Sequence, residues 1–85
     1  MKLEQEIVRL GQDIVVRAVL QYLYQHHPNV TGFEQLKYAL SLDDTFSEMT
    51  LRPLVATRIL EMSDGGFSLT IGAFSVLQLH PELVS

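Results

Sequence analysis

The chain has 85 residues, of which 47% are apolar and 19% charged, and ten acidic against six basic side chains give a net charge of −4. This length supports one domain with a modest core, and the composition is that of a globular rather than a disordered chain. The chain has no cysteine, which excludes disulfides and thiolate chemistry and fits a reducing cytoplasm. No apolar run reaches the roughly 20 residues of a membrane span, and the acidic Glu4 and Glu6 oppose a signal peptide. We therefore expect a cytoplasmic protein with no membrane partner.

An apolar repeat predicts a helix over residues 2–27. The repeat is formed by residues three or four positions apart, namely Leu3, Ile7, Leu10 and Ile14. Apolar side chains then surround most of the helix up to Tyr24, which indicates a buried central helix. Gly11 followed by Asp13 indicates either a kink or a restart with Asp13 as N-cap, and Pro28 should end the helix.

A second helix is predicted from about Gly32 to Ser41. Thr31 and Glu34 have the spacing of a capping box, in which the two side chains satisfy each other's free backbone donors. The side chains expected to face inward are Phe33, Leu36 and Leu40. Residues 42–47 then form a polar connection.

Pro53 complicates the start of the third helix. Thr45 and Glu48 offer a capping box, but a proline cannot lie deep inside a helix that begins there. We favour a helix that is capped by Thr50, holds Pro53 in its first turn and ends near Arg58. The alternative is a single kinked helix.

The pair Asp64-Gly65 predicts a β-hairpin with a two-residue type I′ turn, because both residues accept a positive φ. The pairs across the hairpin would be Met62 with Phe67, Leu60 with Leu69, Glu61 with Ser68, and Ile59 with Thr70. One face would then be apolar and the other largely polar, as a half-buried ribbon requires. The apolar face would close the core with Leu60, Met62, Phe67 and Leu69.

Two interpretations remain for the segment after the hairpin. Phe74 and Leu77 share a helical face, Thr70 can cap such a helix and Pro81 would end it. The other interpretation extends the sheet with a third strand at 73–79. We favour the helix.

This order of elements, together with one run of sequence, resembles the winged helix-turn-helix superfamily. The run is LxxLVATRILEMSDGGFSLT, from Leu51 to Thr70, with a helix, an Ile-Leu-Glu strand, a glycine-containing wing and an aromatic-x-Leu-Thr strand. The resemblance implies a mainly α fold with a small β-hairpin (α+β), in which residues 1–85 form one domain around a three-helix core. It also implies a DNA-binding transcriptional regulator, with the third helix in the major groove and the wing on the backbone.

Charge speaks against that DNA-binding role. The DNA-contacting residues that the resemblance implies are Lys37, Ser47, Thr50, Arg52 and Arg58. Acidic residues lead into the third helix, and the hairpin tip carries Asp64 but no base. Since phosphate contact normally needs several lysines or arginines, DNA remains an alternative partner only.

The N-terminal apolar repeat suggests a protein interface instead. In one interpretation residues 1–12 project from the domain and pair with a second copy or a partner helix. The interface residues would be Leu3, Ile7, Leu10 and Ile14, and the C-terminal Leu77, Leu79, Leu83 and Val84 could add to the same surface. In the other interpretation the repeat packs on the chain's own core.

Candidate catalytic and metal-binding residues are few. A metal site formed by His26, His27 and His80 would need loop geometry and a fourth ligand, and Asp43-Asp44 has no partnered histidine nearby. We therefore expect no enzyme activity, no metal and no cofactor. The favoured hypothesis is a non-catalytic winged-helix-like interaction module that acts through protein–protein contact or homodimerisation. The alternatives are a DNA-binding transcriptional regulator and a small enzyme or metal-binding protein.

Overall fold

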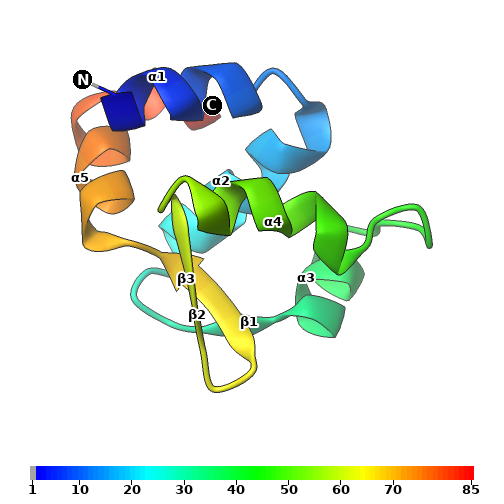
Figure 1. Ribbon diagram of the computed structural model, residues 1–85. Helices are drawn as coiled ribbons and strands as arrows, with labels where there is room; N and C mark the ends of the chain where they lie inside the picture. Colours follow the sequence, from blue (N-terminus) through cyan, green and yellow to red (C-terminus); the bar gives the residue numbers. More distant parts are fainter. Residues whose placement is uncertain (1) are drawn as a thin grey trace.

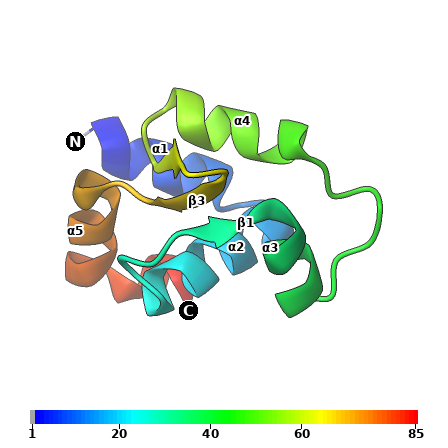
Figure 2. The same ribbon diagram turned by 90° about the horizontal axis from the view of Figure 1, so that it is seen from below.

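The computed structural model describes residues 2–85 and shows a mainly helical chain with a small antiparallel sheet, which confirms the predicted α+β fold class (Figure 1). The elements are α1 (Lys2–Leu10), α2 (Ile14–Gln25), β1 (Thr31–Gly32), α3 (Phe33–Ala39), α4 (Glu48–Ala56), β2 (Leu60–Ser63), β3 (Gly66–Leu69), α5 (Ile71–Leu79) and the 3-10 helix η1 (Pro81–Val84). In the view of Figure 2 the strands run between α4 above and α2 below, with α5 on the left and α3 on the right. The three-stranded sheet has the order β1-β3-β2, so β3 is central and β2 lies at an edge.

The N-terminal helical region is broken rather than continuous. The chain leaves α1 at Gly11 and restarts at Asp13, whose Oδ1 accepts hydrogen bonds from the backbone N–H groups of Val15 at 2.8 Å and Val16 at 3.4 Å. This confirms the restart with Asp13 as N-cap. A side chain at Gly11 would stand 2.8 Å from the carbonyl oxygen of Ile7, so glycine is required where α1 ends.

The first helix packs on the chain's own core. Ile7 is buried, Leu3 and Leu10 are half-buried against the core, and α1 lies beside α5. His80 Nε2 lies 3.1 Å from the carboxylate of Glu4, which joins α1 to the end of α5. For residues 2–12 the interpretation as a projecting segment is therefore wrong, because their apolar stripe already has a partner within the domain.

The first strand was not predicted. Thr31 pairs with Phe67 and Gly32 pairs with Gly66, so β1 lies along the free side of β3. A side chain at Gly66 would come within 2.4 Å of Val30 Cγ1 and 3.0 Å of the Thr31 carbonyl oxygen, so this pairing depends on glycine. A strand of two residues has no periodicity by which a sequence could reveal it.

The predicted capping box at Thr31 and Glu34 is wrong. The N-cap of α3 is Gly32, without a side-chain hydrogen bond, while Thr31 is buried in β1. On α3 itself Leu36 is fully buried, and Phe33 stacks on Phe46 with ring centroids 4.9 Å apart. The connection expected to be polar thus contributes Phe46 to the core.

The hairpin has the predicted register and turn. The structure pairs Leu60 with Leu69, Glu61 with Ser68, Met62 with Phe67, and Ser63 with Gly66. Asp64 has a φ of 51° and Gly65 a φ of 76°, as a type I′ turn requires. The predicted core role of Met62 is wrong, since the residue is 60% exposed. Ser68, on the face expected to be polar, is buried as well; β3 is the central strand and is also in contact with α2 and α5.

The third helix of the predicted set, α4, begins earlier than expected. Its N-cap is Ser47, whose N–H donates to Thr50 Oγ1 at 3.5 Å, so the predicted cap at Thr50 is wrong. Pro53 consequently lies inside one helix, beyond the first turn. Because proline has no backbone N–H, the carbonyl of Met49 lacks the hydrogen bond that residue 53 would otherwise donate to it. Met49 and Pro53 are both exposed, so water can reach this carbonyl.

The segment after the hairpin is the predicted helix and not a third strand. Thr70 caps α5, since its Oγ1 accepts from Ala73 N–H at 3.1 Å. Pro81 follows the helix as expected and opens η1, in which Val84 is buried beside α2 and α5.

Candidate functional site

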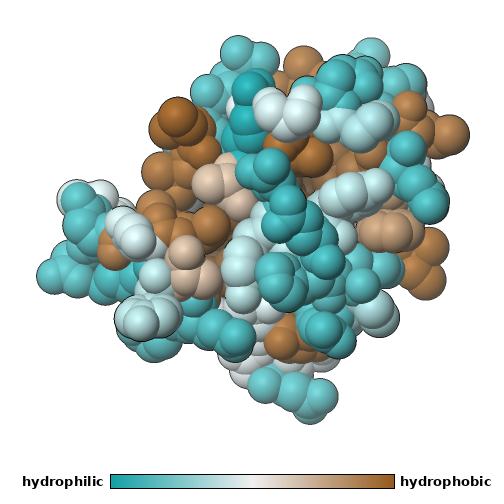
Figure 3. All heavy atoms as spheres, turned by 180° about the vertical axis from the view of Figure 1, so that it is seen from behind, coloured by the Kyte–Doolittle hydropathy of each residue, from teal (hydrophilic) through white to brown (hydrophobic). Residues whose placement is uncertain are grey.

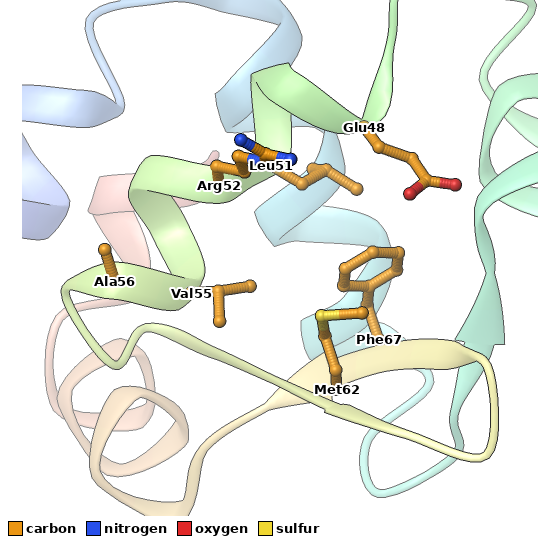
Figure 4. Close-up of a pocket in the computed structure, with 7 residues that line it drawn as sticks. All are labelled: Glu48, Leu51, Arg52, Val55, Ala56, Met62 and Phe67. Carbon is orange, nitrogen blue, oxygen red and sulfur yellow. The ribbon is translucent and has the colours of Figure 1, made fainter.

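A cleft of about 430 Å³ lies between α4 and the β2–β3 hairpin, and we call it the α4–hairpin cleft (Figure 4). It is lined by Glu48, Leu51, Arg52, Val55, Ala56, Met62 and Phe67. Leu51 and Val55 share one face of α4 because they are four positions apart. Met62 and Phe67 share one face of the hairpin because they are opposite each other.

The cleft has a buried apolar floor and an exposed apolar wall. Leu51 and Phe67 are only 1% and 4% exposed, whereas Met62 is 60% exposed. In Figure 4 the ring of Phe67 projects from the hairpin toward α4, with the sulfur of Met62 beside it. The carboxylate of Glu48 extends past that ring at one end. An apolar group that entered the cleft would therefore meet aliphatic side chains on the α4 side, and the ring of Phe67 and the sulfur of Met62 on the hairpin side.

A second hollow of about 470 Å³ continues along β2. Its lining residues are Val55, Ala56, Arg58, Leu60, Glu61, Met62 and Thr70. Val55, Ala56 and Met62 belong to both hollows, which therefore form one depression that we call the α4–β2 groove. The groove runs from Glu48 at the start of α4 to Arg58 at the start of β2.

The charge along the groove is mixed and slightly acidic. Arg52 and Arg58 stand with Glu48, Glu61 and Asp64 around α4 and the hairpin. Within residues 2–85 none of these five has an oppositely charged group within 4.0 Å. These charges remain available to a ligand, but two bases against three acids do not make a basic surface.

The residues implied for DNA contact are only partly brought together. Arg52 lines the α4–hairpin cleft and Arg58 the second hollow, whereas Ser47, the N-cap of α4, donates its N–H to Thr50 Oγ1 in the first turn. Lys37 Nζ lies 2.6 Å from the carboxylate of Asp44. The hydrogen bond that Lys37 donates to Asp44 raises the pKa of Lys37 above its ordinary value, and the carboxylate offsets the positive charge of the lysine.

The residues expected to form a protein interface do not share one open surface. Of the four in the N-terminal repeat, Ile14 alone is well exposed, at 82%. Leu77 and Val84 are buried, Leu83 is half-buried and Leu79 is exposed. Seen from behind, hydrophobic atoms reach the surface in separate patches with hydrophilic side chains between them (Figure 3).

The histidines do not converge. His26 stacks on Tyr22, and His27 stacks on Phe74 with ring centroids 4.0 Å apart. His80 lies on another element, between the carboxylates of Glu4 and Glu82. Across residues 2–85 no group of three or more histidine, aspartate and glutamate side chains is arranged to hold a metal ion. None of the helices in this described part of the chain has the length and apolarity to cross a membrane.

The groove was missed at the sequence level because Met62 was expected to lie in the core. One signal was available: Val55 extends the apolar face of α4 beyond Leu51 and Leu54, which already supply its fully buried contacts. Comparison of the chain with protein-family models, curated proteins and solved structures found no match. The proposed function therefore rests on the arrangement of α4 and the hairpin.

Proposed function

We propose that this chain is a non-catalytic, winged-helix-like interaction domain that binds a segment of another protein in the α4–hairpin cleft. The observation that carries the proposal is the chemistry of this cleft, in which apolar side chains form the floor and one wall and charges stand only at the rim. In a winged-helix protein that binds DNA, the corresponding helix and wing would be expected to present bases to phosphates. Here they present the apolar Met62 and Val55, with three carboxylates against two bases around them.

The cleft supports binding of a protein side chain on energetic grounds. Burying one large aliphatic or aromatic side chain contributes about 1.5–3 kcal/mol. Protein interfaces usually depend on a few such anchors in desolvated pockets, surrounded by a polar rim. Phe67 and Leu51 are already held rigidly by the core, so they form a preformed base for such an anchor.

DNA binding stays as a second candidate because Arg52 and Arg58 have no acidic partner within residues 2–85. It predicts binding to a 20-base-pair duplex at about 50 mM salt that weakens in Arg52→Ala and falls steeply with added salt. Fluorescence anisotropy with a labelled duplex measures this directly. Absence of any binding at that salt concentration removes the candidate.

Site-directed photo-crosslinking tests the proposed function. A benzophenone amino acid at position 62, beside the cleft, should yield a discrete protein adduct in cells. The same group at Tyr38, which is 88% exposed on α3 and does not line the cleft, is the matched control. The adduct should disappear when Val55→Glu places a charge in the cleft.

Three results would count against the proposal. They are adducts with nucleic acid, equal adducts from positions 62 and 38, and an adduct that survives Val55→Glu. A second copy of the chain as the only adduct would instead identify the homodimer. Sedimentation of the purified protein with and without Val55→Glu then measures that association.

A further inference from the structure

His80 lies where α5, η1 and α1 meet. It follows the last residue of α5, and its N–H donates to the Val76 carbonyl at 2.9 Å. It also precedes η1, and its carbonyl accepts from the Leu83 N–H at 3.1 Å. The backbone of His80 is therefore held on both sides, while its side chain reaches Glu4 on α1.

The two ring nitrogens of His80 face carboxylates from different elements. Nε2 lies 3.1 Å from Glu4 Oε2 on α1, and Nδ1 lies 3.5 Å from Glu82 Oε2 on η1. A neutral imidazole has one N–H group and one lone pair, so it can present a proton to only one of the two acids. The imidazolium form has an N–H on each nitrogen and a positive charge that attracts both carboxylates. The arrangement of the two glutamates therefore suits the charged form of His80.

Glu4 and Glu82 are the only acidic side chains within 4.0 Å of the His80 ring among residues 2–85. The helix α5 carries no charged side chain of its own. On α1 the neighbouring Glu6 pairs with Arg9. The carboxylates that respond to a charge on the imidazole are therefore one on α1 and one on η1.

The other titratable groups of the packed helices have contacts of their own. Lys2 lines a hollow at the end of α4, and Arg17 Nε on α2 donates to a backbone carbonyl at 3.2 Å. The two histidines after α2, His26 and His27, stack on aromatic rings, and the tyrosines of α2 take part in the same aromatic contacts.

The contact with Glu4 lies beside the point where α1 rests on α5. The residue before it, Leu3, is half-buried, and its Cδ2 would stand 3.2 Å from a Cβ at Gly72. The side chain of Leu3 therefore covers the backbone of α5 where a glycine leaves it open. Once His80 is neutral it presents an N–H to one glutamate at most, so the first turn of α1 then depends more heavily on this small apolar contact.

We propose that His80 is a pH-sensitive latch, which in its protonated form holds the first turn of α1 and the helix η1 against the end of α5. Histidine changes its charge between about pH 5 and 8, where glutamates are charged. The latch is closed near pH 5.5 and loosens toward pH 8, because the contribution of a histidine with acidic partners is lost as the pH rises. Loosening uncovers Leu3 and the backbone at Gly72. No residue of the latch lines the α4–hairpin cleft, so the latch is independent of the proposed function.

Hydrogen exchange of the Ile7 amide in the 85-residue chain measures the latch. In an α-helix this N–H bonds to the carbonyl of Leu3, so it exchanges faster when the first turn of α1 opens. Its exchange rate, divided by that of an unstructured peptide at the same pH, should rise about threefold from pH 5.5 to pH 8, as suits a partly exposed ion pair. An unchanged ratio overturns the proposal.

Two substitutions at His80 separate its charge from its packing. His80→Gln is never charged, so the exchange ratio at Ile7 should be high and equal at both pH values. His80→Arg is charged throughout, so the ratio should be low and equal at both. The matched control is His26→Gln, which removes an exposed histidine with no carboxylate within 4.0 Å among residues 2–85 and should retain the threefold rise. A rise that persists in His80→Gln, or that disappears in His26→Gln, overturns the proposal.

Glu4→Gln keeps the test decisive if neither His80 variant folds. It removes the acidic partner on α1 and leaves Glu82 on η1. The rise at Ile7 should disappear, while the amide of Leu83, which donates to the His80 carbonyl, should still exchange faster at pH 8. If Ile7 keeps its threefold rise in Glu4→Gln, His80 does not act through Glu4 and the proposal fails.

Discussion

Met62 and Phe67 lie directly opposite each other across the hairpin, yet Met62 is 60% exposed and Phe67 only 4%. The two side chains are on the same face of the ribbon, so alternation alone predicts the same burial for both. The difference arises because Phe67 is on the central strand β3, between β1 and β2, while Met62 is on the edge strand. The core therefore ends at Phe67, and Met62 forms the outer wall of the α4–hairpin cleft.

This relationship predicts unequal effects of truncation on stability. Phe67→Ala should lower the free energy of unfolding by about 3–5 kcal/mol, because it removes a buried ring and leaves a cavity. Met62→Ala should change it by no more than about 0.5 kcal/mol. Urea denaturation followed by circular dichroism measures both values, and Phe67→Leu serves if the alanine variant does not fold. Similar losses in both variants would show that Met62 belongs to the core.

A second prediction concerns the turn. Gly65 has a φ of 76°, and no atom lies near the position of an added Cβ, so the strain of a side chain there is purely conformational. Gly65→Ala should lower the free energy of unfolding by about 1–2 kcal/mol. Gly65→Asn should cost clearly less, because asparagine tolerates the left-handed region. Equal urea midpoints for the wild type and both variants would contradict this assignment of strain.

Local signals in the sequence were sufficient for the hairpin and for two helix caps. Asp64-Gly65 determines its turn through the φ values of two adjacent residues, and the register follows from the turn. Asp13 and Thr70 cap their helices through hydrogen bonds to residues two or three positions away. Such features depend on neighbours in sequence and can be predicted from them.

Features that depend on distant contacts were not predicted. The two-residue strand β1 exists because Gly66, far along the chain, allows Thr31 to approach closely. The cap of α4 moved to Ser47 although Pro53 argued for a later start, since one lost hydrogen bond on an exposed helix face is tolerated. The groove itself depends on which strand is the edge of the sheet, and that follows from the pairing of β1.

A third prediction concerns Thr70, which joins the hairpin to α5. Its hydroxyl donates to the Arg58 carbonyl at 2.7 Å, and its Oγ1 accepts from Ala73 N–H at 3.1 Å. Arg58 has a φ of 64°, so this hydrogen bond supports a backbone conformation that arginine rarely adopts. Thr70→Ala should lower the free energy of unfolding by about 1–2 kcal/mol.

The matched control for this site is Thr70→Ser, which keeps the hydroxyl and should retain most of the stability. Urea denaturation gives the difference between the two variants. If serine and alanine cost the same, the missing methyl group and not the hydroxyl is responsible.

A fourth prediction concerns the acid limb of the stability curve. Hydrogen bonds from the Thr45 hydroxyl and the Thr45 backbone N–H hold the pKa of Asp43 below its ordinary value of 3.8. The folded state therefore binds fewer protons at this group than the unfolded state does, so the contribution of Asp43 is fully present above pH 3.8. It is lost as the pH falls through the lowered folded-state pKa.

Two variants isolate this contribution. Thr45→Ala removes the hydroxyl donor and should return the pKa of Asp43 toward its ordinary value, while Asp43→Asn removes the titrating group. Both should flatten the fall of the urea midpoint as the pH drops below 3.8, and the remaining fall belongs to the other carboxylates. An NMR titration of the Asp43 carboxyl carbon in the wild type should have its midpoint below 3.8. A midpoint at or above that value would contradict the hydrogen-bonding account, because a carboxylate that accepts two hydrogen bonds is stabilised in its charged form.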